Sequence, residues 1–188
     1  MKKNMYRVMC LVFLMALGGC AHLINPGRSP QVSLNTVPAY KEHLSVCLVN
    51  NQPDKSKQLF AGINGHTFYA NYNLWTDYFI RQWRHALIKR GVNVSNESPN
   101  KIKVKLSDFQ YVQGFAKVRL IMRLELESAD GTWKKEYEET DTSGWSMGRA
   151  FGSDIYSSIE RVLSDKEIID HMRIKSAAGK VANAMELK

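Results

Sequence analysis

The feature that most constrains the fold is the stretch 115–128, in which every second residue from Ala116 to Leu126 is apolar. Side chains of a strand point alternately to the two faces of a sheet, so this period of two predicts a strand with one buried face and one hydrated face. The apolar set is Ala116, Val118, Leu120, Met122, Leu124 and Leu126, and the positions between them include Lys117, Arg119, Arg123, Glu125 and Glu127. Such a sheet needs a covering layer on its apolar face only.

A hairpin is expected after this strand. Asp130-Gly131 is a favoured two-residue hairpin turn, and it leads into a second alternating segment, 132–142. The register that this turn sets pairs Glu127 with Lys134, Arg123 with Glu138, and Leu124 with Tyr137. Opposite charges then meet on the hydrated face, and apolar residues meet on the buried face. We therefore expect the cationic row to be a solvated, partly neutralised surface, with anion binding as the alternative.

Two further segments have the patterns of strands. The short apolar run 44–49 predicts a strand that is buried on both faces. In 101–108, Ile102, Val104 and Leu106 alternate with lysines, and the phase then reverses, which predicts a bulge near Ser107-Asp108.

Helical periodicity appears on either side of these strands. An aromatic and aliphatic stripe predicts a core-facing helix from an N-cap at Asn73 to Arg90, with Gly91 as its stop signal. A second stripe predicts a helix at 150–163, and Ser164 with Glu167 forms a capping box for a further helical stretch at 165–175. The element order is strand, helix, three strands, helix. It predicts an α+β two-layer sandwich, with a mainly antiparallel sheet of about four strands and helices on one face.

The segment 50–72 lacks a clear period but carries four aromatic residues, Phe60, Phe68, Tyr69 and Tyr72. Long loops in compact domains are usually functional or disordered, and this aromatic content argues against disorder. Aromatic side chains dominate binding hot spots, so these four residues form the predicted partner-binding surface. The alternative is that the rings close an open edge of the core.

The N-terminus has the organisation of a lipoprotein signal peptide. Three basic residues precede an uncharged apolar run at 8–17, which is too short to span a bilayer. The run ends in Leu17-Gly18-Gly19-Cys20, the bacterial lipobox. This motif predicts that the Cys20 thiol accepts a diacylglyceryl group and that Cys20 becomes the first residue of the mature chain.

These signals divide the chain and place it in the cell. Residues 1–19 are the expected signal peptide, and residues 20–39, with three prolines, are the expected lipidated cysteine and flexible tether. The range 40–175 is the expected single domain, and 176–188 the expected frayed tail. In enteric-type bacteria an Asp after the lipidated cysteine favours retention in the inner membrane. Residue 21 is Ala, so the resemblance to that sorting rule implies an outer-membrane anchor facing the periplasm.

Composition excludes several other classes of protein. The 188 residues are 44% hydrophobic and 23% charged, which suits one globular domain. The net charge is +8, but no basic cluster is interleaved with aromatic residues, so no nucleic-acid partner is expected. Cys47 is the one cysteine left after processing and is expected to be buried. The five histidines lack the spacing of metal ligands, and no cofactor fingerprint occurs, so neither a metal nor a cofactor is expected.

One motif suggests catalysis. Gly144-Trp145-Ser146-Met147-Gly148 fits the nucleophile elbow of hydrolases and lies between a strand and a helix. However, a hydrolase elbow follows a central, parallel, apolar strand, whereas the segment before Gly144 alternates and is half-solvated. The one downstream histidine, His171, directly follows Asp170, and neighbours on a helix do not face each other. We therefore expect no enzyme, with an esterase that uses Ser146 as an alternative.

The chain resembles the YajG-type bacterial lipoproteins in four features. These are the lipobox, the element order, the sequence Arg90-Gly91-Val92 at the end of a helix, and a closing helix rich in Ile and Val. The similarity covers about residues 40–175 and extends more distantly to auxiliary lipoproteins of ABC-type lipid-transport systems. It implies a non-enzymatic accessory or binding role for an envelope protein partner or a lipid. A purely structural envelope lipoprotein is a further alternative.

Overall fold

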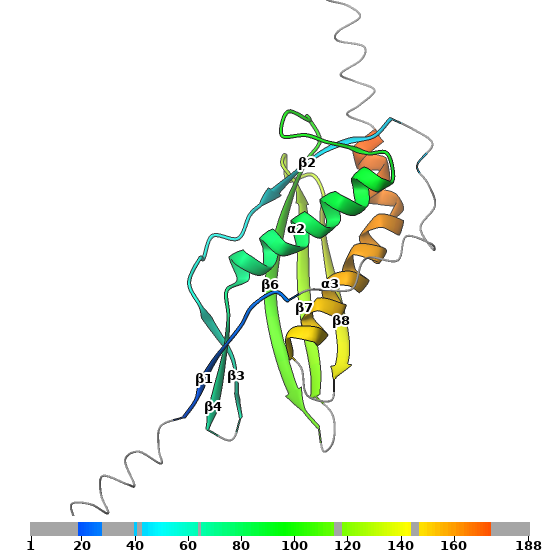
Figure 1. Cartoon of the computed structure of the whole chain (residues 1–188). Coiled ribbons are helices and arrows are strands. Elements are labelled where there is room, and N and C mark those ends of the chain that lie inside the picture. The colour runs from blue at the N-terminus through cyan, green and yellow to red at the C-terminus, as the bar shows by residue number, and fades with distance from the viewer. Residues whose placement is uncertain are drawn as a thin grey trace, which may run out of the picture.

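The computed structural model describes residues 19–27, 40, 43–63, 65–114, 118–143 and 147–173. Within them, two long helices cover one face of a five-stranded sheet, and a three-stranded sheet projects beside them (Figure 1). The helices are α2 (Tyr72–Lys89) and α3 (Met147–Ser164), followed by a helical segment at 166–173. The predicted α+β sandwich with helices on one face is confirmed.

The five-stranded sheet is mixed. Its order is β5 (Asn93–Val94), β2 (Ser45–Asn50), β6 (Lys101–Gln113), β7 (Val118–Ser128) and β8 (Lys134–Ser143). The strands β6, β7 and β8 form the predicted antiparallel meander, whereas β2 pairs in parallel with both β5 and β6. The sheet therefore has one more strand than predicted, and its first three strands are parallel. The parallel pairing arises because α2 carries the chain back to the starting end of β2, as crossover helices do.

The predicted hairpin register is confirmed, although its turn differs. Glu127 pairs with Lys134, Arg123 with Glu138, and Leu124 with Tyr137. The connection is longer than two residues, because the Ser128 N–H bonds to the Trp133 carbonyl and the Gly131 N–H to the Ser128 carbonyl. The predicted bulge is also present, since the register of β6 against β7 shifts between Leu106 and Asp108.

The helices bury the predicted stripes against this sheet. In α2 the buried set includes Trp75, Phe79, Trp83, Ala86 and Leu87, and in α3 it includes Phe151, Ile155, Ile159 and Val162. They face the apolar side of the sheet, where Leu120, Met122, Leu124 and Leu126 are fully buried. The core thus lies between one helical layer and one sheet, as the one-sided alternation requires.

Both predicted helix caps are wrong by one or two residues. The α2 N-cap is Asn71, whose Oδ1 accepts a hydrogen bond from the Leu74 N–H at 3.0 Å, while Asn73 lies inside the helix. At the second boundary Ser164 ends α3, and Asp165 caps the next segment by accepting from the N–H of Glu167 at 3.0 Å. In both places an earlier or more strongly accepting oxygen takes the cap position.

Candidate functional site

The segment expected to be a long loop forms a second sheet instead. β3 (Gln58–Ile63) and β4 (His66–Ala70) make a hairpin whose turn contains Gly65 at φ +79°, a conformation that glycine adopts without strain. β1 (Ala21–Ile24) pairs in parallel with β4, giving the order β1-β4-β3. The prediction of a flexible tether is therefore wrong for Ala21–Ile24, because these residues form a strand. Residues 28–39 of the predicted tether lie outside the described part of the chain. Short strands with small and polar residues left too weak a period to be detected.

The three-stranded sheet carries none of the charged residue types. Its strands have the sequences AHLI, QLFAGI and HTFYA, which together contain no Lys, Arg, Asp or Glu. At the 23% found for the whole chain, 15 residues would hold about three charges. In contrast, β6, β7 and β8 are densely charged. This difference marks the small sheet as a chemically distinct surface.

Aromatic rings attach the inner face of the small sheet to the core. The Phe60 ring lies 6.5 Å from Phe68 within the sheet, 6.3 Å from Phe109 of β6, and 5.4 Å from Phe151 of α3, measured between centroids. Edge-to-face contacts of this kind add to the energy of apolar burial. Phe60 and Phe68 are half-buried, so these two predicted binding residues help to close the core.

Tyr72 also belongs to the core rather than to an exposed surface. Its side chain is 6% exposed, and its hydroxyl accepts a hydrogen bond from the Phe109 N–H at 3.2 Å. Burial raises the pKa of this phenol above its ordinary value. The placement of Tyr72 on a partner-binding surface is therefore wrong. Beside it, Trp75 donates its indole N–H to the Ile24 carbonyl at 3.0 Å and so fixes β1 to the helix.

Apolar side chains form a row across the outer face of the small sheet. Leu23, Tyr69 and Leu59 are paired in register on β1, β4 and β3, and residues paired in this way share a face. Leu23 is 39% exposed and Leu59 is 58% exposed. We call these three residues the outer row. Tyr69, one of the four predicted binding residues, is the member that lies at its centre.

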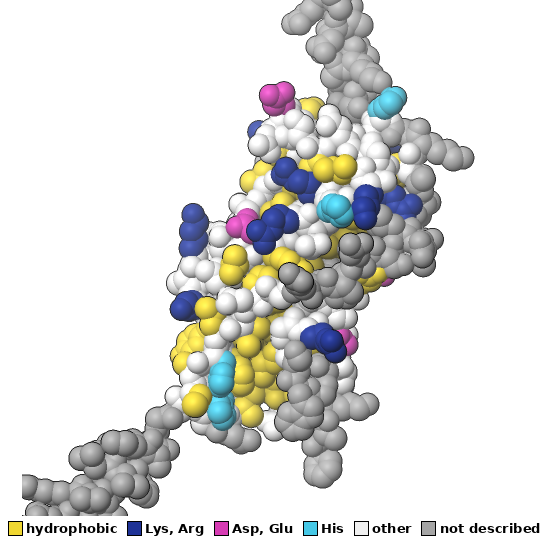
Figure 2. All heavy atoms as spheres, in the orientation of Figure 1, with side chains coloured by type: hydrophobic (Ala, Val, Ile, Leu, Met, Phe, Trp, Pro, Cys, Tyr) yellow, Lys and Arg dark blue, Asp and Glu magenta, His cyan; other side chains and the backbone are white. Residues whose placement is uncertain are grey.

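Cys20 lies at the tip of the same sheet. It is exposed, and its carbonyl accepts a hydrogen bond from the Thr67 N–H at 2.9 Å. A Cβ added to Gly19 would overlap the Gly65 carbonyl oxygen, so the backbone approach requires a glycine there. Figure 2 shows hydrophobic side chains gathered around histidine side chains at this end of the molecule.

The two histidines on this sheet contact each other. His22 Nε2 lies 2.9 Å from His66 Nδ1, and the His22 ring also stacks on Phe68 at 5.0 Å. The five histidines lie far apart in the sequence, and the pairing of β1 with β4 is what brings His22 and His66 together. Among the described residues, no group of three or more His, Cys, Asp or Glu side chains is arranged to hold a metal ion.

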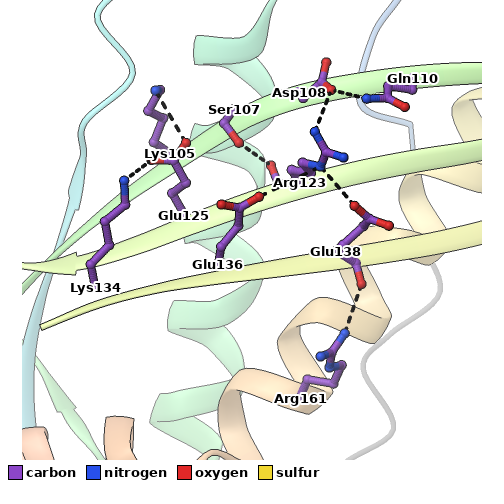
Figure 3. A network of polar contacts seen from close by, with 10 residues as sticks. All are labelled: Lys105, Ser107, Asp108, Gln110, Arg123, Glu125, Lys134, Glu136, Glu138 and Arg161. Carbon is purple, nitrogen blue, oxygen red and sulfur yellow. Dashed lines mark hydrogen bonds and ion pairs between the residues drawn. The ribbon is translucent and has the colours of Figure 1, made fainter.

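The cationic row on the outer face of the large sheet is neutralised by carboxylates (Figure 3). Arg123 lies between Glu138, 2.9 Å from its Nε, and Asp108, 3.6 Å from its Nη1. Glu125 similarly forms two ion pairs, from its Oε2 to Lys134 Nζ at 3.1 Å and from its Oε1 to Lys105 Nζ at 3.7 Å. Burial acts to raise the pKa of Glu125, but the hydrogen bond from Lys134 and the charge of Lys105 bring it below its usual value. This arrangement favours the solvated, neutralised face over the anion-binding alternative.

This network makes a testable prediction. Replacing Arg123 with Glu would place a fourth carboxylate beside Asp108, Glu136 and Glu138, so we expect a small loss of stability that is larger at low salt than at high salt. Thermal unfolding at both salt concentrations measures the effect. Arg119→Glu is the matched control, because Arg119 faces Val112 and Thr142. Equal salt dependence in both variants would contradict the network.

A second polar cluster lies between β8 and α3. Lys135 Nζ and the Tyr137 hydroxyl both bond to Asp165 Oδ2 at 2.7 Å. Nearer the start of α3, Asp154 is 1% exposed, and its Oδ2 has no hydrogen-bond partner among the described residues. Burial raises the pKa of Asp154 to about 8, and the nearby charges of Asp141 and Glu139 add to this effect.

The motif that suggested a hydrolase is described only in part. Residues 144–146, which include Ser146, lie outside the described part, and Met147 and Gly148 begin α3. The preceding strand, β8, is an antiparallel edge strand rather than a central parallel one. Asp170 pairs with Arg173 at 2.9 Å, and the His171 ring stacks on Trp133 at 5.8 Å. Neither of these two contacts joins a carboxylate to a histidine.

Comparison with known proteins supplies structural likeness only. No protein family matches the sequence, and no curated protein matches it. A crystal structure of a Xanthomonas campestris protein, assigned to the family DUF330, superposes with a TM-score of 0.45 at 9% identity, covering 86% of this chain and 98% of that one. A second solved structure, of an uncharacterized protein, gives 0.40 at 10% identity, covering 77% and 97%. At these values the likeness does not extend to function.

Proposed function

We propose that the protein is a bacterial envelope lipoprotein, acylated at Cys20 and anchored in the outer membrane facing the periplasm. There it acts as a non-enzymatic accessory or binding module for an envelope protein complex or a lipid-transport system. The observation that carries the proposal is the motif Leu17-Gly18-Gly19-Cys20, which stands directly before the first folded strand and has its cysteine exposed.

The chemistry at Cys20 needs an accessible thiol and small neighbours. The thiolate displaces the phosphorylated headgroup of a phospholipid, and a thioether to diacylglycerol forms. The signal peptidase then hydrolyses the bond between Gly19 and Cys20. Small residues before the cysteine are needed because this bond must enter the narrow active site of the peptidase. Cys47, in contrast, is buried in β2 and is inaccessible to such enzymes. Among the described residues no helix is both long and apolar enough to cross a membrane.

Metabolic labelling tests the acylation. Cells that express the full chain and receive labelled palmitate are expected to yield a labelled, shortened protein, because the acyl chains are added before the signal peptide is removed. Cys20→Ser should abolish both the label and the shortening. Cys47→Ser is the matched control and should keep both. A labelled, shortened Cys20→Ser protein would contradict the proposal.

A separation of membranes tests the location, and an envelope pull-down tests the role. The labelled protein is expected in the outer-membrane fraction of a density gradient, and a defined envelope partner or lipid is expected to co-purify with it. Label in the inner-membrane fraction would contradict the predicted sorting by Ala21.

A further inference from the structure

We propose that the outer row rests on the membrane surface, so that Leu23, Tyr69 and Leu59 contact the lipid at the level of the headgroups. The inference rests on the proposed acylation of Cys20. It adds that the anchor fixes the orientation of the domain, instead of holding it on a free tether.

The covalent anchor brings the row close to the bilayer. Leu23 is the third residue after Cys20 in a strand, so the two lie about 10 Å apart at 3.3 Å per residue. Tyr69 and Leu59 follow on adjacent strands, each about 4.8 Å further along the sheet. Side chains alternate along a strand, so the Cys20 side chain starts on the face opposite to Leu23. Cys20 stands at the end of an edge strand, however, so a flexible diacylglyceryl group on it can pass round the edge of the sheet and hold this end at the headgroup level. A sheet lying flat from that point brings the whole row to the same level.

The chemistry of the outer face suits this environment. Burying a charged side chain at an interface is costly, and β1, β3 and β4 contain no Lys, Arg, Asp or Glu. Leucine side chains favour the acyl boundary, and a tyrosine combines an apolar ring with a hydroxyl that reaches water or headgroups. The exposed Lys57 directly precedes β3, where it can meet anionic lipid phosphates.

The small sheet can pass this orientation to the domain because it is fixed to the core. The indole N–H of Trp75 holds the Ile24 carbonyl, and Phe60 packs against Phe109 and Phe151. The Thr67 N–H holds Cys20 itself in the sheet. Cys20 is therefore joined to α2, α3 and β6 through the strands of the small sheet and their contacts with the core.

Spin labelling of the acylated full chain tests the inference. In a Cys47→Ala background, a nitroxide is attached at Leu59→Cys, and the protein is reconstituted into vesicles of phosphatidylethanolamine and phosphatidylglycerol. Its collision rates with oxygen, which concentrates in lipid, and with a water-soluble nickel complex are compared. Ile88→Cys on α2 is the matched control, because Ile88 is equally apolar and 56% exposed but lies on another element.

The expected result is an oxygen-to-nickel ratio several-fold higher at position 59 than at position 88 in vesicles. In detergent-free protein that also carries Cys10→Ser and Cys20→Ser, so that position 59 or 88 holds its only thiol, the two ratios should be similar. Flotation with the vesicles is measured on the same samples. A protein that fails to float contradicts the proposed acylation. A protein that floats but gives equal ratios at 59 and 88 overturns this inference alone. Protection of position 59 in native envelopes but not in vesicles also overturns it, because a protein partner would then cover the row.

Discussion

Leu124→Asp is expected to leave the domain unfolded at room temperature. Leu124 is fully buried at the centre of β7, where it pairs with Leu106 on one side and Tyr137 on the other. Removing the leucine costs roughly 2–5 kcal/mol, and burying an unpaired carboxylate costs several more. Domains are typically stable by only about 5–15 kcal/mol, so the sum exceeds or exhausts the available stability.

The adjacent residue supplies the control for this prediction. Arg123 points to the opposite face of the same strand. Its side chain is 38% exposed and is surrounded by carboxylates. Circular dichroism and thermal unfolding should show a folded Arg123→Glu protein and no cooperative transition for Leu124→Asp. The milder Leu124→Ala should fold with a loss of about 2–5 kcal/mol in chemical denaturation. Similar losses for Arg123→Glu and Leu124→Asp would refute the assignment of faces in β7.

The second large effect is a gain in stability from Asp154→Asn. The folded protein holds the Asp154 carboxyl at a pKa of about 8, whereas the unfolded chain gives it an ordinary pKa near 3.8. Between these values the unfolded state binds fewer protons than the folded state, so this residue makes stability fall as the pH rises from about 4 to about 8. Asparagine cannot ionise. We therefore expect the variant to match the parent near pH 4 and to exceed it at pH 8 by a few kcal/mol.

Chemical denaturation across this pH range measures the effect. The readout is the difference between variant and parent at each pH, because contributions from other groups, such as the lowered pKa of Asp165, then cancel. Glu160→Gln is the matched control, since it removes one negative charge from a more exposed position of the same helix. A pH-independent difference for Asp154→Asn, or an equal pH dependence for Glu160→Gln, would show that burial of Asp154 does not penalise its charge.

The sequence predicted the register of the β7–β8 hairpin to the residue but missed the small sheet, and the two cases differ physically. In β7 and β8, long alternation and many opposite charges allow only one register, since a slip of one residue would reverse both faces. In β1, β3 and β4 the strands are four to six residues long and contain glycine, alanine and histidine. Their pairing depends on contacts with Phe109, Phe151 and Trp75, which are remote in sequence.

The candidate site was predicted in parts. The lipobox cysteine and the aromatic residues of 50–72 were identified, but the sequence did not show that they belong to one sheet. The four aromatic residues take different positions in the structure. Tyr69 lies in the outer row, Phe60 and Phe68 lie against the core, and Tyr72 starts α2. Leu23 and Leu59 were missed because isolated leucines in short segments have no period. The absence of charged residues from all three strands was the signal that could have found them.

The parallel pairing of β1 and β2 has a consequence for the order in which the chain folds. Neighbours in sequence form the meander β6–β7–β8, whereas Ala21 pairs with Thr67 and Cys47 with Lys101, separations of 67 − 21 = 46 and 101 − 47 = 54 residues. Contacts that close long loops cost more entropy and form later. The strand that leads from Cys20 is thus among the last to dock and, as a four-residue strand at the edge of its sheet, among the first to detach. A chain built this way can fold its core before its N-terminal strand docks.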